Sequence, residues 1–424
     1  MNTYWLSLII CCGIISSTGL YASRDNAHYY RATNFFGEPR FEKPWLGTFD
    51  FYASYGSTST GFNGEGKKVP LLDIYGPYNM LQLGVGVPGK DLSTIPDIVL
   101  EELTLIPSQG CFGQLSFDGK FKLTELNAFF IQNLNRGFFL QLHIPARFIT
   151  MDNICYCDLS PDNCQEPNKN NPIWQAFLAN SQDIFAQYCV KAYPVHERGV
   201  GDISLELGWT LNYQETDVLD FVDFTIKSGF LFASSPRQDP NLVFAVPIGY
   251  NGHSGIPLSL EAAFGTYDWL TIGGHFGALF LLSDCHNVRM KTSVDQSGLI
   301  KLAQGRAKVD KGTIWEAEGY FKADHIVRGF SLLFAYSFVT EGKDTLTPQK
   351  CSLFCPDIVN TDASLASWNM HTIHARAEYD FTKEHSRVGT RITFFYDFPI
   401  SGKRIFRTGM VGGHCGIDIA WQLD

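Results

Sequence analysis

Apolar and polar side chains alternate most regularly between Gly201 and Phe232. From Asp202 to Tyr213 the odd positions are almost all apolar and the even positions are mostly polar, and the alternation resumes from Val222 to Phe232 after a polar stretch at 214–220. A period of two indicates a strand with two unlike faces. Strands of soluble proteins average about five or six residues, whereas a strand tilted through a bilayer needs about nine to eleven. The length and the alternation together predict a membrane β-barrel.

The same alternation recurs along the chain after residue 44. We count twelve such segments, with fourteen as the alternative, and predict an all-β, antiparallel transmembrane β-barrel. The segments are 45–55, 113–131, 138–148, 202–213, 222–232, 256–266, 269–282, 313–323, 328–339, 370–381, 387–398 and 413–423.

The connections between these segments alternate between short and long. Those at 132–137, 214–220, 267–268, 324–327 and 382–386 are short, and the intervening ones are mostly long. Antiparallel neighbours place alternate connections on opposite sides of a membrane, and bacterial outer-membrane barrels have short periplasmic turns and long external loops. The pattern therefore predicts the outer membrane of a Gram-negative-type bacterium, with the long loops outside.

The segments before the first strand have a different character. Residues 1–22 are uncharged and largely apolar, which predicts a signal peptide, and the polar residues 23–44 form a lead-in to a single barrel domain at 45–424. No later apolar run approaches the roughly 18 residues that a membrane-spanning helix needs. The formal net charge of -10 gives no basic surface for nucleic acid.

Two long connections carry features of their own. Residues 56–112 contain apolar patches at 69–75 and 95–106, so we expect this segment to cover the barrel mouth or to enter the lumen as a plug. Residues 150–201 contain Asn171 and Pro172, a helix N-cap and first position followed by apolar residues at helical spacing, which predicts a short helix.

Nine cysteines remain after the predicted signal peptide, all in or beside the long connections. Exported thiols on one side of the membrane predict disulfides that staple the external loops, above all 150–201, with one cysteine left over. Their spacing does not match a zinc site, so we expect no metal. The candidates are Cys111, Cys155, Cys157, Cys164, Cys189, Cys285, Cys351, Cys355 and Cys415.

If the apolar parity faces lipid, the other parity faces the lumen and carries many charges. Such charges either set up a field that orients dipolar solutes or pair with their neighbours to fill a narrow lumen, and both alternatives stay open. The predicted pore-lining residues are Asp202, Glu206, Asp223, Lys227, Glu261, His275, Glu316, Glu318, Lys322, His374, Arg376, Glu378, Arg387, Arg391 and Asp397.

No motif predicts catalysis. Some twelve-stranded outer-membrane barrels are phospholipases that present His-x-Ser on a strand, but here His253 and Ser254 are adjacent and fall in a predicted loop. His286, His371 and His414 are isolated in the sequence. We therefore expect neither an enzyme nor a cofactor.

The alternating segments and the terminal stretch Gly416–Trp421 resemble Gram-negative outer-membrane β-barrel proteins, porin-like in plan. Three residues follow Trp421, whereas such proteins commonly end on an aromatic residue. The resemblance implies a barrel, monomeric or homo-oligomeric, that contacts the lipid bilayer and the barrel insertion machinery and passes small polar solutes. A surface-binding or adhesin-type barrel with a closed lumen is the alternative, and an outer-membrane lipase is a weaker one.

Overall fold

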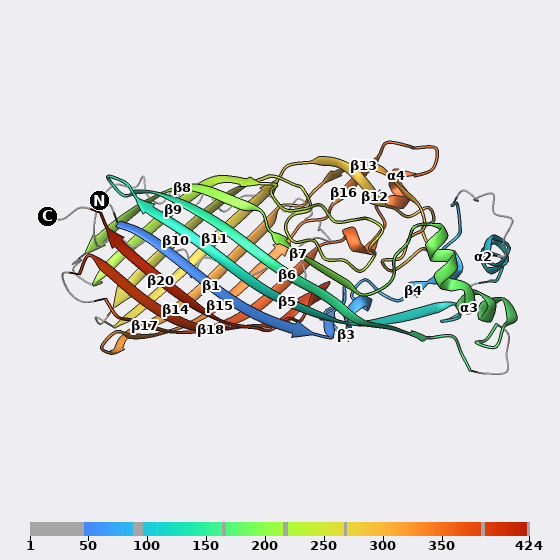
Figure 1. Ribbon diagram of the computed structural model, residues 1–424, viewed down its shortest axis with the longest axis horizontal. Coiled ribbons are helices and arrows are strands. Elements are labelled where there is room, and N and C mark those ends of the chain that lie inside the picture. The colour runs from blue at the N-terminus through green and yellow to red at the C-terminus, as the bar shows by residue number, and fades with distance from the viewer. Residues whose placement is uncertain are drawn as a thin grey trace, which may run out of the picture.

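A computed structural model describes residues 46–421 apart from 88–95, 108, 163–166, 215–218, 267–268 and 383–385. The predicted signal peptide and lead-in, and Cys164, therefore lie outside the described residues. The described part forms a long, closed barrel with a lobe of loops and helices at one end (Figure 1). No helix in the described ranges is long and apolar enough to cross a membrane.

The twelve predicted barrel strands are confirmed. They are β1 (Leu46–Thr58), β5 (Gln114–Asn133), β6 (Phe138–Asp158), β8 (Ile203–Gln214), β9 (Phe221–Phe232), β10 (Gly255–Thr266), β11 (Leu270–Leu281), β14 (Ile314–Val327), β15 (Phe330–Glu341), β17 (Trp368–Asp380), β18 (Val388–Lys403) and β20 (Met410–Ala420).

The barrel closes through its first strand. β1 pairs with β20 on one side, from Leu46↔Ala420 to Gly56↔Met410, and with β5 on the other. The remaining barrel strands pair with their sequence neighbours in antiparallel ladders. Closure leaves no unpaired edge in the transmembrane wall, which is the condition for a sheet to span hydrocarbon.

Alternate positions of each strand face the lumen and the outside, as the hydrophobic pattern predicts. On β1, Asp50 and Tyr52 are buried, whereas Phe51 is 52% exposed. On β18, Arg391 is buried, whereas Phe394 is 69% exposed. Large apolar side chains exposed around a closed barrel are stable only against lipid, so this outer surface is the membrane-facing one.

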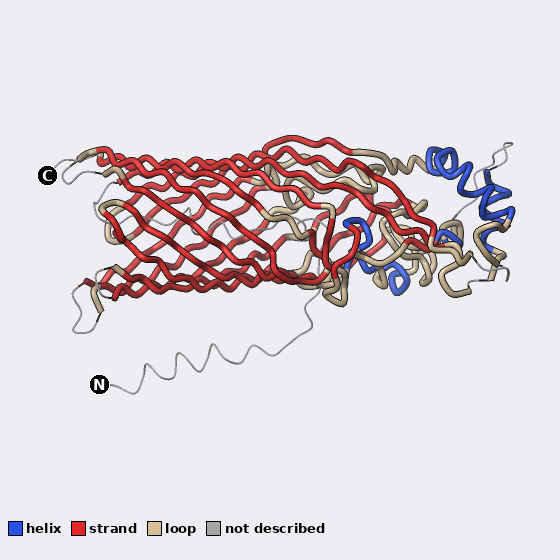
Figure 2. Tube along the Cα trace, turned by 90° about the horizontal axis from the view of Figure 1, so that it is seen from below, coloured by secondary structure: helices blue, strands red, loops and turns tan. Residues whose placement is uncertain are grey.

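Short turns join the strands at one end and long connections join them at the other, so the predicted alternation is confirmed (Figure 2). Tyr213, Trp269, Tyr379 and Trp421 are exposed near the short-turn end. Amphipathic aromatic rings are enriched at the membrane interface. These aromatic residues mark one membrane interface. Bacterial outer-membrane barrels have short periplasmic turns and long external loops, so the turn end is assigned to the periplasm and the long connections to the outside.

The two longest strands leave the membrane and support the external lobe. β5 has 20 residues and β6 has 21, about twice the length that a bilayer crossing needs. The register of their pairing shifts between Asp118 and Lys120. Beyond that shift the two strands continue as a two-stranded arm that carries the helices (Figure 1).

The lobe contains elements that the alternation of residues does not predict, because they are short and irregular. Its strands are β2 (Thr60–Phe62), β3 (Lys68–Pro70), β4 (Tyr78–Asn79), β7 (Val195–Val200), β12 (Asp284–Arg289), β13 (Gln304–Asp310), β16 (Thr345–Pro348) and β19 (Ile405–Phe406). Its helices are η1 (Leu71–Asp73), η2 (Met80–Gln82), α2 (Pro96–Thr104), α3 (Pro172–Gln187), α4 (Pro356–Val359) and η3 (Ala363–Leu365).

The helix predicted after Asn171 is confirmed as α3. The side chain of Asn171 accepts hydrogen bonds from the backbone N–H groups of Ile173 (3.1 Å) and Trp174 (3.3 Å), and Pro172 occupies the first turn. These bonds satisfy amide groups that have no partner within the helix.

The external lobe has an apolar core of its own. Leu71, Leu72 and Tyr78 from the β1–β5 connection pack with Phe117 of β5 and Phe244 of the β9–β10 connection. The rings of Tyr78 and Phe117 form a tilted contact, with their centroids 4.6 Å apart. Residues 71–83 thus lie in the lobe, against the external extension of β5 and above the transmembrane wall.

The cysteines differ from the sequence prediction. None of the eight cysteines in the described part of the chain forms a disulfide, so the predicted loop staples are absent there. Cys415 lies within β20 rather than in a loop, and its side chain is exposed on the outer, lipid-facing parity. Apolar packing, rather than covalent cross-linking, therefore holds the described external loops together.

Candidate functional site in the barrel lumen

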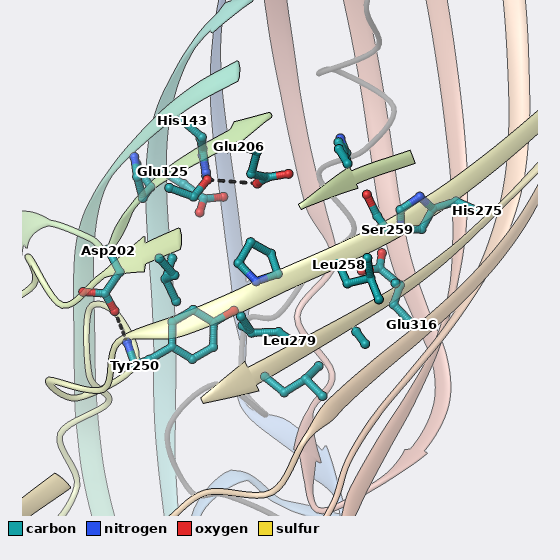
Figure 3. A pocket seen from close by; sticks show the side chains of 18 of the residues that line it. Glu125, His143, Asp202, Glu206, Tyr250, Leu258, Ser259, His275, Leu279 and Glu316 are labelled. Carbon is teal, nitrogen blue, oxygen red and sulfur yellow. Dashed lines mark hydrogen bonds between the residues drawn. The ribbon is translucent and has the colours of Figure 1, made fainter. Parts of the chain in front are cut away.

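A cavity of about 160 Å³ lies inside the barrel below the external lobe (Figure 3). Its walls come from β5, β6, β8, β9, β10, β11 and β14, and the β9–β10 connection contributes Tyr250. Charged and polar side chains line much of it, among them Glu125, Arg147, Lys227 and Glu316. The cavity exceeds by several fold the roughly 30 Å³ that one water molecule occupies in the liquid.

The β5–β6 wall of the cavity is fixed by side-chain pairs. Nε of Arg147 donates to Oε1 of Glu125 at 2.8 Å, and both side chains are largely buried. Nε2 of His143 lies 2.8 Å from Oδ1 of Asn127, and the imidazole stacks on Phe129 with ring centroids 4.2 Å apart. These pairs hold the β5–β6 wall in a defined arrangement, while Nδ2 of Asn127 is buried without a hydrogen-bond partner among the described residues.

The 233–254 connection borders the cavity through Tyr250 and is tied to the barrel. Oδ1 of Asp202 accepts from the backbone N–H of Ser235 at 2.9 Å, and Oδ2 accepts from that of Tyr250 at 2.5 Å (Figure 3). Arg147 donates through Nη1 to the carbonyl oxygen of Ile248 at 2.5 Å. Burial raises the pKa of Tyr250, so its phenol stays neutral and can only hydrogen-bond. Asp202 therefore anchors a loop as well as lining the cavity.

Four further ionisable side chains line the cavity, namely Lys227, Glu206, Glu316 and His275. In the described part of the chain, Nζ of Lys227 donates to Oε1 of Gln141 at 3.4 Å, and Glu206 accepts from the hydroxyl of Ser204 at 3.2 Å. Glu316 and His275 line the opposite side on β14 and β11, which are neighbours in the sheet. Nδ1 of His275 is buried without a hydrogen-bond partner among the described residues. The cavity thus offers groups of both charge signs to a small polar molecule.

The far wall of the lumen has its charges paired. Arg391 binds Asp50 at 2.5 Å and Asp418 at 2.9 Å, and Arg376 binds Glu378 at 3.1 Å. Both arginines are thus paired with carboxylates. Of the two alternatives for the lumenal charges, pairing with neighbours therefore applies to this wall, and these arginines do not set up a field of unpaired charge across the lumen.

The structure places all but one of the predicted pore-lining residues on the lumen side of the wall. Those bordering the cavity are Asp202, Glu206, Lys227, His275 and Glu316. Others lie above, below or across from it, namely Asp223, Glu261, Glu318, Lys322, His374, Arg376, Glu378, Arg391 and Asp397. Arg387 is exposed in the bend before β18, because that strand begins one residue later than the alternation suggests.

Sequence reasoning missed Glu125, His143 and Arg147 as cavity residues. His143 and Arg147 have the polar parity of β6, so their signal was present in the alternation, whereas Glu125 shares its parity with apolar residues of β5 and gave no such signal. Tyr250 carried no such signal, because a loop residue reaches the cavity only through tertiary packing. The pairing of Asp50 with Arg391 was equally hidden, because the two residues lie 341 positions apart.

The adjacent His253 and Ser254 do not form a nucleophile and base. His253 is fully buried, its Nδ1 lies 2.8 Å from the carbonyl oxygen of Leu282, and its ring packs edge-on against His286. Among the described residues, no group of three or more His, Cys, Asp or Glu side chains is placed to hold a metal ion.

The closed antiparallel wall, the apolar exterior and the charged interior define an outer-membrane β-barrel. No protein-family model and no curated protein sequence matches the chain. Among solved structures, it is similar to an outer-membrane channel from Pseudomonas putida F1, with 10% identity and a TM-score of 0.49 over 92% of this chain and 100% of that one.

Two further similar structures are barrels of other kinds. One is the translocator domain of the autotransporter NalP from Neisseria meningitidis, with 9% identity, a TM-score of 0.35 and 89% of each chain covered. The other is a Pseudomonas aeruginosa FadL homologue, with 10% identity, a TM-score of 0.33, and 96% of this chain and 100% of that one covered. The assignment to the outer membrane rests on the barrel of this chain itself.

Proposed function

We propose that this barrel is an outer-membrane channel for small polar solutes, with the lumenal cavity as its solute-binding point. The observation that supports this most is the mixed charge of the cavity, because Lys227 lines the same space of about 160 Å³ as Glu206 and Glu316. Such an arrangement suits a solute that carries both charges, since each end finds an opposite partner. An apolar molecule would displace water from these charged groups without replacing the hydrogen bonds that water makes to them.

The external lobe acts in this proposal as a lid. Asp73 in η1 accepts hydrogen bonds from the hydroxyl of Ser116 and from the backbone N–H of Phe117 at 2.9 Å, and so ties the β1–β5 connection to the arm. Burial raises the pKa of Asp73. Passage through the barrel would then require the lid to separate from the arm.

Conductance in planar bilayers tests the channel. We expect the refolded wild-type protein to give small, infrequent openings in potassium chloride, and a variant with residues 64–110 replaced by a Gly-Ser linker to give larger ones. Asp73→Ala is the milder companion, because it loosens the lid while keeping its apolar packing. A complete lack of current from all three folded proteins would exclude the channel.

A surface-binding barrel is the second candidate. It is favoured by the separate core of the external lobe, in which Trp174 and Phe177 of α3 are fully buried. A lobe that keeps a fixed shape outside the membrane is suited to contact a partner. If a partner binds the external lobe of a barrel that conducts no ions, the surface-binding function is favoured. Contact with the barrel insertion machinery and the number of copies per assembly stay predictions.

A further inference from the structure

Ser337, His374 and Asp397 form a continuous chain of hydrogen bonds on the lumen wall. The hydroxyl oxygen of Ser337 lies 2.8 Å from Nε2 of His374, and Nδ1 of the same ring lies 2.8 Å from Oδ1 of Asp397. An ionised carboxylate only accepts, so Nδ1–H donates to Asp397 and Nε2 accepts from the serine hydroxyl. This is the hydrogen-bond order in which a histidine can activate a serine as a nucleophile.

Three adjacent strands hold the chain in place. His374 on β17 lies directly opposite Asp397 on β18, and Ser337 on β15 lies one lumenal position away from His374 along the ladder. The three residues are 1%, 3% and 7% exposed in chain order. A nucleophile and base positioned on rigid strands and shielded from bulk water meet the geometric requirement for acyl transfer.

A hydrogen-bond donor also faces the nucleophile. Thr372 is directly opposite Ser337 in the β15–β17 ladder, where Cβ atoms approach to about 5 Å. Its hydroxyl is buried and has no hydrogen-bond partner in the part of the chain that the structure describes. An unpaired donor at this position can stabilise the oxyanion that forms when a serine attacks a carbonyl carbon.

We propose that Ser337, His374 and Asp397 form a second functional site, which hydrolyses small carboxylic esters that enter the lumen. Oγ of Ser337 attacks the carbonyl carbon while Nε2 of His374 takes the hydroxyl proton. The ester C–O bond then breaks, and the leaving alcohol receives that proton. Water then attacks the carbonyl carbon of the acyl-serine while Nε2 of His374 takes a proton from it, the bond from that carbon to Oγ breaks, His374 gives this proton to Oγ, and the carboxylic acid leaves. Asp397 positions the imidazole and touches no substrate.

The surroundings of the site select the charge of the ester. Glu318 on β14 lies directly opposite Ser337, and both of its carboxylate oxygens are buried without a hydrogen-bond partner among the described residues. The next lumenal residue on β14 is Glu316, which borders the cavity. Two acidic side chains therefore lie along β14 between the cavity and the position opposite Ser337, and these surroundings disfavour anionic esters. Neutral and cationic esters are the substrate class.

Labelling with diisopropyl fluorophosphate tests the site directly. Attack by Oγ on phosphorus displaces fluoride and leaves a stable mass increase on the serine. We expect one label on the folded wild-type barrel, on Ser337, and none after Ser337→Ala. His374→Ala should slow labelling by at least about 100-fold, because general-base catalysis contributes about 10² to 10⁴. Hydrolysis of p-nitrophenyl acetate should fall in parallel.

Ser331→Ala is the matched control, because Ser331 lies on the same strand and the same lumenal face and is 6% exposed. It should leave labelling unchanged. For the positioning residue, Asp397→Asn should slow labelling and Asp397→Glu should restore part of the rate, which loss of packing would not explain.

The labelling is run on the wild type and on Asp73→Ala, each checked for folding by its heat-modifiable gel mobility, so that a closed lid does not hide the site. Absence of label from both folded proteins, or a label that persists after Ser337→Ala, would overturn the proposal. Ion current is measured separately, so failure of the channel and failure of the ester-hydrolysing site can be told apart.

Discussion

Arg391 on β18 reaches past β20 to Asp50 on β1, with Nη2 2.5 Å from Oδ1. The strand between them contributes Gly416, which is in register with both residues. A Cβ atom built on Gly416 would lie 2.5 Å from Nε of Arg391 and 2.6 Å from Oδ1 of Asp50. Only glycine at this position lets the two side chains meet across an intervening strand.

Gly416→Ala should therefore destabilise the barrel where β20 closes it against β1. Overpacking of this kind costs typically about 1 to 3 kcal/mol, and separating the buried ion pair adds to that cost. Unfolding in guanidinium chloride, followed by tryptophan fluorescence in micelles, would report a lower midpoint. Gly413→Ala is the control, because the nearest atom to its added Cβ, outside its chain neighbours, is 3.7 Å away. Equal midpoints for the two variants would contradict the assignment.

Arg289 is the second structural centre, and it lies in the external lobe. Its guanidinium donates to the carbonyl oxygens of Pro240, Tyr188 and Lys301 at 2.8 to 3.0 Å, and so joins three separate connections. It also donates to further acceptors, namely Leu302, Cys189 and Asn241.

Arg289→Ala should loosen the lobe without unfolding the barrel. A local loss of about 1.4 kcal/mol raises the population of the open lobe tenfold, and limited proteolysis of the external loops should accelerate by at least that factor. Arg306→Ala, which removes an exposed arginine from β13, should leave the cleavage rate unchanged. Unaltered cleavage in Arg289→Ala would show that apolar packing alone holds the lobe.

Lys227→Glu should shift the ion selectivity of the proposed channel towards cations. The substitution changes the charge of the cavity by two units, and each unit is worth about 1 to 4 kcal/mol at 4 Å, depending on the effective dielectric. Reversal potentials in a salt gradient should therefore report a severalfold change in the ratio of cation to anion permeability. Lys308→Glu, on the external strand β13, provides the control for a charge change far from the cavity. Identical shifts in both variants would argue against the cavity as the ion path.

The ion pair between Lys301 and Asp362 should make the external lobe sensitive to acid. Burial by itself would raise the pKa of Asp362, but the Lys301 ammonium and hydrogen bonds from Ser364 bring it below its ordinary value of 3.8. A lowered pKa in the folded state contributes stability above pH 3.8, and that contribution is lost as the pH falls through the folded value.

Hydrogen exchange of the lobe measured from pH 6 down to pH 3 would show this loss as faster opening at the acidic end, after correction for the intrinsic exchange rate. Asp362→Asn should start from a lower protection at pH 6 and lose less of it on acidification. If Asp362→Asn leaves the change of protection with pH the same as in the wild type, other carboxylates cause the acid sensitivity.

The free thiols give a test of membrane orientation. Cys155 and Cys351 are exposed in the external lobe, whereas Cys415 faces lipid from β20. A membrane-impermeant maleimide added outside intact cells should label Cys155→Ser and Cys351→Ser at one site fewer than the wild type. It should give the same label count for Cys415→Ser as for the wild type. If these cysteines are labelled only after reduction, they form disulfides, as the sequence predicts.

The strands could be read from the sequence because a barrel wall imposes one simple rule on every residue in it. Alternate side chains contact lipid and lumen, so the parity of Leu205 and Glu206 or of Phe394 and Arg391 reports which face each occupies. The same rule located Lys227 and Glu316 on the lumen side. It went wrong at Arg387, because parity does not mark the residue at which a strand begins.

The external lobe could not be read in this way, because its residues obey no single period. Leu72, Phe117 and Phe244 come from three distant segments and meet only in the folded core. The absence of disulfides among the described cysteines could not be read either, because spacing along the chain does not show which thiols meet in the fold.

The alternation of side chains thus determined the class of fold, the number of strands, the side of the membrane and the residues that face the lumen, since each follows from a local periodicity. Only the tertiary structure decided which lumenal groups touch. Hydrogen bonds between Ser337, His374 and Asp397, and the ion pair of Asp50 with Arg391, depend on strand register across the closed wall. Register is set by the pairing of whole strands, and no single segment contains it.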